Sequence, residues 1–250
     1  MLDLLLLDII QSMKQRNSSR SYYPLSVDLR NRKVVVVGGG GVAERKVQGL
    51  LSAGAQVKLV SPEVTEALGK MAADGLIYHA ARAFVPEDLD KAWLVIAATD
   101  DAEVQELVYK EALSQRTFCN VVDLPEFCSF IVPSVVRRGD LCLSISTGGK
   151  SPALAQYLRK ELEQSLGSFY GDYVSLLGEL RQLIIKSFGD PVNRKDLCQS
   201  LADPEVMAWV RKGEWDRVER WAVSLCGKEA ANIVSSFAKG SLECTVPKVS

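Results

Sequence analysis

The sequence predicts an α/β protein in which a doubly wound parallel sheet is followed by a β-hairpin and then by helices alone. Two observations carry this prediction. Between residues 34 and 122, short apolar runs alternate with helical patterns, which is typical of βαβ units. After Asp123, two strand-like runs follow each other without a helical segment between them, and the remaining pattern is helical.

The composition suits a globular protein of one large or two modest domains. Its 250 residues are 47% hydrophobic and 24% charged, with a net charge of −1. This balance gives no support for binding nucleic acid. The six cysteines form no CxxC pair, and His79 is the single histidine. We therefore expect neither a disulfide framework nor a resident metal, and a Ser-His-Asp triad is improbable.

Residues 1–15 form an apolar N-terminal stretch that is too short to span a membrane and is interrupted by Asp3 and Asp8. It lacks the basic start of a signal peptide. Its apolar spacing predicts a short amphipathic helix, although an extension without structure explains the composition equally well. Together with the scattered thiols, this predicts a cytoplasmic protein with no membrane association.

The stretch 34–46, VVVVGGGGVAERK, organises the first domain. Its apolar run predicts a strand buried on both faces, and Gly38, Gly40 and Ala43 fit the dinucleotide fingerprint G-x-G-x-x-G/A. The helix that follows offers its N-terminal N–H groups to a pyrophosphate. The alternative is a glycine-rich turn without a ligand. The predicted cofactor contacts from this stretch are Gly38, Gly39, Gly40, Gly41 and Val42.

The following elements complete a Rossmann sheet. Strands are expected at 56–61, 76–79, 93–98 and 117–122, and helices at 43–53, 64–73 and 100–113. The second strand ends at Ser61, and Pro62 and Glu63 follow it. No acidic residue therefore ends the strand itself to bind ribose hydroxyls. Pro62 and Glu63 are still expected beside the cofactor, and the charge pattern leaves NAD and NADP open.

The end of the fourth strand offers a second approach to the cofactor. Thr99 is predicted to face it, because open α/β sheets bind ligands at the carboxyl ends of their strands. Asp100 and Glu103 are predicted to form a capping box for the next helix. His79 is expected to have a structural role at a strand end.

The second half begins with an antiparallel hairpin, predicted from runs 129–136 and 141–146 joined by a turn at 137–140. A helix over 153–166 is predicted to start from Ser151 as N-cap and Pro152 in the first turn. Further helices are expected at 169–188, 204–209, 215–225 and 230–238. The loop before Pro152 nearly matches a phosphate-binding P-loop, but Ser144 replaces its first glycine, which argues against a nucleoside triphosphate.

Five segments occur in order and carry a resemblance to a known family: GGGGVAERK, AGAQVKLVSPE, WLVIAATDD, FCNVVDLPEFCSFIVPS and LSISTGGKSPALAQYLRKELE. Over residues 23 to about 190 the chain resembles the siroheme synthase dehydrogenase/chelatase family. The resemblance implies an NAD-binding Rossmann domain, a dimerisation region and a small helical domain. It also implies oxidation of precorrin-2 to sirohydrochlorin with NAD⁺, insertion of Fe²⁺ by some members, and a homodimer.

The resemblance carries site residues onto this sequence. Asp123, just past the fifth strand, matches the catalytic aspartate and would act as general base, although Asp before Leu-Pro is also common turn chemistry. Asn120 is predicted to contact cofactor or substrate, or to be a structural strand-end residue. The expected contacts to substrate carboxylates are Ser146, Thr147, Gly148, Lys150 and Ser151. Thr147 stands where the family can carry a phosphorylatable serine.

The same motifs predict the domain boundaries. We expect an extension over 1–21, the Rossmann domain over 22–128, the dimerisation region over 129–168, a helical region over 169–238 and a tail over 239–250. The larger relatives append a uroporphyrinogen methyltransferase domain, for which the roughly sixty residues after Asp190 are too few. Cys119 and Cys128 flank Asp123, but isolated cysteines more often pack as small apolar groups than bind metal.

Two other functions use the same sheet and remain open at this point. A non-catalytic NAD-binding module, such as a redox-sensing or regulatory subunit, would share the glycine loop but would not need Asp123 or the loop at 146–151. A different Rossmann oxidoreductase would share the cofactor site and act on another substrate.

Overall fold

The computed structural model describes residues 21–243 of the chain. They divide into two compact units: residues 21–132 with 148–150, and residues 133–147 with 151–243. The helix expected at 1–15 lies outside the described residues, and so does most of the expected tail. In the described part, no helix combines the length and the apolar character that crossing a membrane requires.

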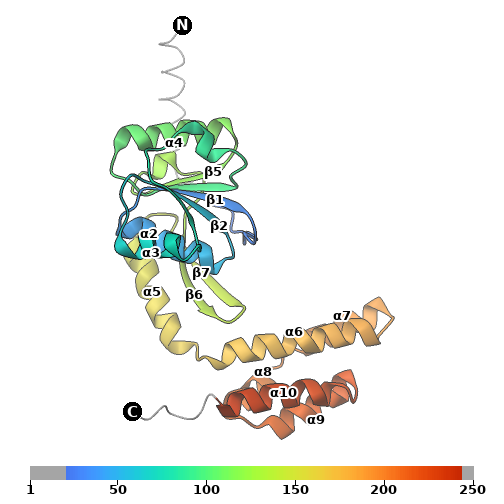
Figure 1. Cartoon of the computed structure of the whole chain (residues 1–250). Helices are drawn as coiled ribbons and strands as arrows, with labels where there is room; N and C mark the ends of the chain where they lie inside the picture. Colours follow the sequence, from blue (N-terminus) through green and yellow to red (C-terminus); the bar gives the residue numbers. More distant parts are fainter. Residues whose placement is uncertain (1–20, 244–250) are drawn as a thin grey trace, which may run out of the picture. The chain divides into compact units, whose positions relative to one another are not determined.

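The first unit is built on a five-stranded parallel sheet with the order β3-β2-β1-β4-β5 (Figure 1). Its strands are β1 Lys33–Val37, β2 Gln56–Val60, β3 Tyr78–Ala80, β4 Leu94–Ala97 and β5 Phe118–Val121. The chain adds β2 and β3 on one side of β1, and β4 and β5 on the other. The predicted doubly wound fold is confirmed, and the strand order reverses between β1 and β4, where such sheets bind ligands.

Helices cover both faces of this sheet. They are α2 Gly41–Ser52, α3 Glu66–Ala73 and α4 Ala102–Ser114, with short 3₁₀ helices η1 Pro86–Leu89 and η2 Pro125–Phe127. Val34 and Val36 of β1 pack in the core beneath α2 and α3, whereas Val35 and Val37 pack in the core beneath α4 (Figure 1). The apolar run of β1 is therefore buried on both faces, as predicted.

Two local predictions in this unit are wrong. The N-cap of α4 is Asp101, not Asp100, because its Oδ1 accepts hydrogen bonds from the N–H groups of Glu103 (3.0 Å) and Val104 (3.1 Å). The hairpin strand does not start at Ser129, whose N–H donates to the Cys119 carbonyl and whose hydroxyl accepts from the Cys119 N–H. These bonds hold Ser129 beside β5.

The second unit starts with the predicted antiparallel hairpin, formed by β6 Ser134–Arg138 and β7 Leu141–Ile145. Gly139 turns the chain with a positive φ of 56°. Arg138 donates from Nε to the Leu166 carbonyl (2.8 Å) and from Nη2 to the Glu163 carbonyl (2.6 Å), which caps the end of the next helix. The hairpin and α5 Pro152–Ser165 are thereby joined, and Ser151 caps α5 as predicted.

The remaining helices form a bundle around α6. They are α6 Phe169–Ser187, α7 Pro191–Ser200, α8 Pro204–Lys212, α9 Trp215–Cys226 and α10 Ala230–Glu243. Leu176, Leu180 and Ile184 of α6 are fully buried against residues of α8, α9 and α10. Helix α7 was not predicted, because no side chain on it is buried and its sequence lacks a clear apolar stripe.

A buried carboxylate ties the β2–β3 side of the sheet together. Asp88 accepts from Lys58 Nζ (2.6 Å), from the Arg82 guanidinium (2.7 Å) and from the Val85 N–H (3.0 Å). Burial by itself raises the pKa of Asp88, but the bonds from Arg82, Lys58 and Val85 outweigh it and hold the pKa well below its usual range. The charged form of Asp88 therefore stabilises the fold.

We predict that Asp88→Ala lowers the free energy of unfolding by about 2 kcal/mol, because it removes a buried ion pair whose cations retain some access to water. Urea denaturation followed by circular dichroism measures the change. Asp74→Ala, at the exposed end of α3, is the control and should stay within about 0.5 kcal/mol of the wild type.

The ion pairs of Asp88 with Lys58 and Arg82 also make the stability of the fold depend on pH. Since the folded pKa of Asp88 is lowered, its stabilisation is complete above the usual aspartate value of about 3.9 and is lost as pH falls below it. The difference between wild type and Asp88→Ala should be constant from pH 7 to pH 5 and shrink below about pH 4. A difference that stays constant below pH 4 would contradict the role of the charge.

Candidate active site

Gly38 is the first residue after β1 and lies where the strand order reverses. Its φ is +109°, and a Cβ on it would lie 2.1 Å from the Ala98 carbonyl oxygen. Its N–H donates to the Val60 carbonyl (2.9 Å). Only glycine satisfies this backbone conformation and this close approach, so the ends of β1, β2 and β4 meet here without any intervening side chain.

Gly39 has a packing role that the sequence did not reveal. A Cβ on it would lie 1.9 Å from the Glu63 carbonyl oxygen and 2.9 Å from Ser61 Oγ. Ser61 Oγ donates to the same Glu63 carbonyl (2.6 Å), and the Thr65 N–H donates to the Gly39 carbonyl (2.9 Å). The loop after β2 is thus packed directly against the glycine loop.

Gly40 and Gly41 face open space. A Cβ on either residue would meet no atom within 4 Å. Gly40 is the N-cap of α2, and among the described residues no side chain caps that end of the helix. The N–H groups at this end of α2 are uncapped and face open space, and the helix dipole is positive here. Such a site suits a pyrophosphate. These residues therefore fit the phosphates of an NAD-type cofactor.

The other predicted cofactor contacts follow β2 and β4 or lie in β5. Pro62 and Glu63 are exposed after β2, and Thr99 follows β4, where its carbonyl accepts from Gln105 Nε2 (2.6 Å). Asn120 in β5 is buried, and its amide donates to the Phe130 carbonyl (3.0 Å) and to Cys128 Sγ (3.5 Å). These hydrogen bonds favour a structural role for Asn120 at the strand end over contact with cofactor or substrate.

Asp123 lies at the same carboxyl edge of the sheet, in the turn after β5. Its side chain is exposed, and its φ of +63° is in the left-handed region. Aspartate and asparagine adopt this conformation more readily than most residues other than glycine, and Asn31, Lys91 and Arg116 share it in other turns. The turn therefore holds a carboxylate at the ligand edge of the sheet.

Cys128 holds this turn through its thiol. Its Sγ accepts from the Val121 N–H (3.3 Å) and contacts the carbonyl oxygens of Val121 (3.2 Å) and Leu124 (3.3 Å), to one of which it can donate. The two carbonyls lie on either side of Asp123 in sequence. The sequence predicted that both Cys119 and Cys128 pack as small apolar groups. This is confirmed for Cys119, where burial raises the thiol pKa to about 12, whereas the Cys128 thiol makes polar contacts.

Lys46 on α2 is a second residue that sequence reasoning missed. Burial, followed by the charge of Arg45, lowers the pKa of Lys46, while Cys128 and Asp123 act in the opposite direction. The half-buried ammonium is therefore close enough to interact with the Asp123 carboxylate. No motif assigns a role to this position, so the three-dimensional fold was needed to find it.

The loop expected to bind substrate carboxylates lies directly before α5. Thr147 Oγ1 accepts from the Ser151 N–H (3.0 Å), and Ser151 Oγ caps α5 by accepting from the Leu154 N–H (3.2 Å). Gly148 and Gly149 have positive φ values, and Lys150 and Ser146 are exposed. Both hydroxyls thus shape the loop. The described residues contain no group of three or more His, Cys, Asp or Glu side chains placed to hold a metal.

Two family models match the chain. An NAD(P)-binding model covers residues 25–134, and the model described as the central part of sirohaem biosynthesis proteins covers residues 138–165. The first contains the glycine loop and Asp123, and the second contains the loop before α5.

Relatives match most of the chain. Siroheme synthase 2 of Yersinia enterocolitica is 43% identical over 187 residues, or 75% of this chain and 40% of the relative. Siroheme synthase of Methylobacillus flagellatus is 43% identical over 189 residues, which cover 74% of this chain and 40% of the relative. The chain thus spans about two fifths of the length of these relatives. The solved structure of SirC, precorrin-2 dehydrogenase, matches with a TM-score of 0.65 and 25% identity, over 87% of this chain and all of that one.

The glycine loop gives a test of cofactor binding. Gly40→Val should fold normally, since a Cβ there meets nothing within 4 Å, and should weaken NAD⁺ binding at least about tenfold by occupying the space of the pyrophosphate. Calorimetric titration with NAD⁺ measures the affinity. Gly49→Val, at an open position on the same helix, should leave it unchanged.

Gly39→Val distinguishes a glycine required for packing, Gly39, from one that faces open space, Gly40. It should lower the melting temperature, because its side chain would overlap the Glu63 carbonyl. Unchanged NAD⁺ affinity in a folded Gly40→Val variant would show that the cofactor binds elsewhere.

Proposed function

We propose that this chain, which is 43% identical to two siroheme synthases over about three quarters of its length, oxidises precorrin-2 to sirohydrochlorin with NAD⁺. The observation that carries the proposal is the position of Asp123: an exposed carboxylate, held in a left-handed turn, at the same sheet edge as the open glycine loop. The proposed enzyme acts in the cytoplasm, which the scattered thiols favour.

The proposed mechanism divides the work between cofactor and protein. When bound, NAD⁺ accepts the hydride. Gly40, Gly41 and the N-terminal N–H groups of α2 bind the pyrophosphate, and the Asp123 carboxylate accepts the proton that leaves the macrocycle with the hydride. The ammonium of Lys46 interacts electrostatically with this carboxylate. The competing base, His79, lies in β3 with Nε2 bonded to the Ser61 carbonyl (2.9 Å), which supports Asp123 in the role.

The loop from Ser146 to Ser151 is proposed to bind carboxylate arms of the substrate. Lys150 supplies a charge, and the glycines before it let the backbone approach a ligand closely. Fe²⁺ insertion into sirohydrochlorin is a second candidate activity, because stripping the pyrrole N–H protons needs a base and Asp123 is accessible. A non-catalytic NAD-binding module would need neither Asp123 nor the loop from Ser146 to Ser151.

We predict that Asp123→Asn lowers the rate of precorrin-2 oxidation about a hundred- to ten-thousand-fold while NAD⁺ affinity stays unchanged. Asparagine keeps the shape and tolerates the left-handed backbone, but it cannot accept the proton. The assay follows NADH and the sirohydrochlorin chromophore. Asp100→Asn, exposed after β4, is the control and should stay near wild type. Near-normal oxidation by Asp123→Asn would remove the catalytic assignment.

The same site tests the second activity. Wild type and Asp123→Ala are given sirohydrochlorin and Fe²⁺ without NAD⁺, and metal insertion is followed by absorbance. If the wild type exceeds the uncatalysed rate and the alanine variant does not, one aspartate serves both reactions. If the wild type gives only the uncatalysed rate, the chain is a dehydrogenase alone.

We also propose a homodimer built on residues 129–166. A two-stranded sheet such as β6–β7 has two open edges, and isolated hairpins are marginally stable. On α5, Leu154 and Leu158 are 48% and 39% exposed. A second copy that covers these strands and this helix would satisfy both features, and twofold assemblies are the commonest closed solution.

Analytical ultracentrifugation at micromolar concentration should therefore find a dimer. Replacing both Leu154 and Leu158 by Glu should shift it to monomer, because two charges would have to be buried in the interface. Leu113→Glu, at a 62% exposed position on α4, should leave the dimer intact. A monomeric wild type would refute the proposed dimer.

A further inference from the structure

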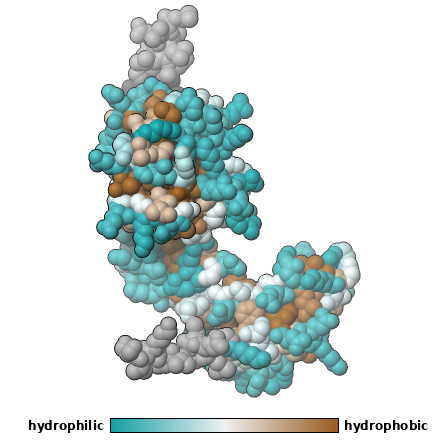
Figure 2. Space-filling model, in the orientation of Figure 1, coloured by the Kyte–Doolittle hydropathy of each residue, from teal (hydrophilic) through white to brown (hydrophobic). Residues whose placement is uncertain are grey.

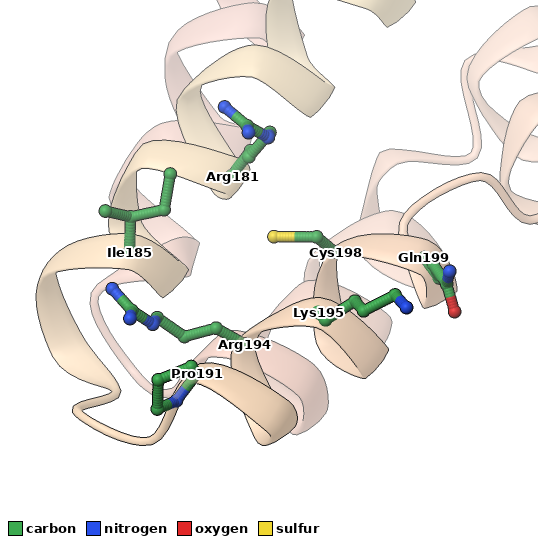
Figure 3. A pocket seen from close by; sticks show the side chains of 7 residues that line it. All are labelled: Arg181, Ile185, Pro191, Arg194, Lys195, Cys198 and Gln199. Carbon is green, nitrogen blue, oxygen red and sulfur yellow. The ribbon is translucent and has the colours of Figure 1, made fainter.

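A hollow in the helical region has no role in the chemistry described so far. It has a volume of about 460 Å³ and lies between α6, which contributes Arg181 and Ile185, and α7, which contributes Pro191, Arg194, Lys195 and Cys198 (Figure 3). The hollow is shallow and largely open to solvent, so a ligand would contact it on one side. All of its lining residues belong to the second unit, so the hollow is defined within one compact body.

Three cations surround this hollow, and no acidic side chain lines it. Within the described residues, Arg181, Arg194 and Lys195 form no salt bridge. Asp196 follows Lys195 on α7 and Glu179 precedes Arg181 by two residues on α6, but neither side chain lines the hollow. Asp190 is the N-cap of α7, and its oxygens accept from the N–H groups of Val192 and Asn193 at 3.3 Å. Like charges on facing helices repel one another, so an anion between them would be stabilised.

The lining combines these cations with an apolar floor. Ile185, Pro191 and Cys198 contribute carbon and sulfur surface, and the Cys198 sulfur points toward the gap between the helices, with Arg181 and Arg194 on opposite sides of it (Figure 3). Arginine binds carboxylates through two parallel hydrogen bonds, and two arginines from different helices can hold two carboxylates at a fixed spacing. The preferred ligand therefore has an apolar body and several carboxylate arms.

We propose that this hollow, named here the α6–α7 pocket, is a second anion site that binds carboxylate groups of a small polycarboxylate. If the proposed function holds, the edge of a carboxylated tetrapyrrole is the ligand that fits both the cationic rim and the apolar floor. A free di- or tricarboxylate offers the same arms without the apolar body. The α6–α7 pocket is distinct from the glycine loop and Asp123, which belong to the first unit.

The experiment titrates the full chain with uroporphyrin, a stable porphyrin with eight carboxylates, and records stoichiometry and affinity by fluorescence. The wild type should bind at two sites per chain, one at the active site and one in the α6–α7 pocket. Arg181→Gln with Arg194→Gln should lose one site or weaken it at least about tenfold. The control, Arg220→Gln with Lys228→Gln, removes the same charge from exposed positions of the same unit and should keep both sites.

The outcomes separate the ligands and the two proposals. Displacement of uroporphyrin from the pocket by millimolar citrate identifies a free polycarboxylate as a sufficient ligand, and resistance to citrate identifies the macrocycle. Equal binding by the pocket variant and its control, or no binding by the wild type, overturns the pocket. Precorrin-2 oxidation is measured in parallel: normal oxidation with no pocket binding refutes the pocket alone, whereas pocket binding without oxidation in the wild type refutes the proposed function alone.

Discussion

The structure at the carboxyl edge of the sheet depends on direct contact between the backbones of neighbouring loops, with no side chain between them. Gly38 lies against the Ala98 carbonyl and Gly39 lies against the Glu63 carbonyl, at distances where no Cβ can be accommodated. The loops that follow β1, β2 and β4 therefore form one packed layer. This layer fixes the direction of α2 and leaves its first turn facing open space, so the opening for a cofactor is a consequence of packing beneath it.

The turn after β5 adds a carboxylate to this layer. The backbone of Asp123 is left-handed, a conformation that aspartate and asparagine adopt more readily than most residues. Here the Cys128 thiol engages Val121 and Leu124, and the amide of Asn120 bonds to the Phe130 carbonyl. The segment that follows Asp123 is thereby attached to β5 at several points. These hydrogen bonds hold the turn in place, which explains how an exposed carboxylate can keep a defined position.

The sequence predicted the parts of the fold that depend on local pattern. The buried run of β1, the fingerprint glycines, the hairpin and the Ser151 cap each follow from side-chain periodicity or from turn chemistry within a few residues. Its failures depend on contacts made at a distance. Gly39 is required by a carbonyl more than twenty residues away, and the roles of Cys128 and Lys46 appear only when the Asp123 turn is folded. Helix α7 was not predicted from the sequence, because none of its side chains is buried.

The two kinds of recognition proposed for this chain differ in how much order they require before binding. The cofactor edge uses backbone N–H groups that the packed glycine layer already holds in place, so binding there costs little conformational entropy. The cationic sites use Lys150, Arg181 and Arg194, whose long side chains must be ordered by the ligand. Exposed ion pairs are also screened by salt. Binding of a polycarboxylate to these cations is therefore expected to weaken with ionic strength more steeply than binding of the dinucleotide.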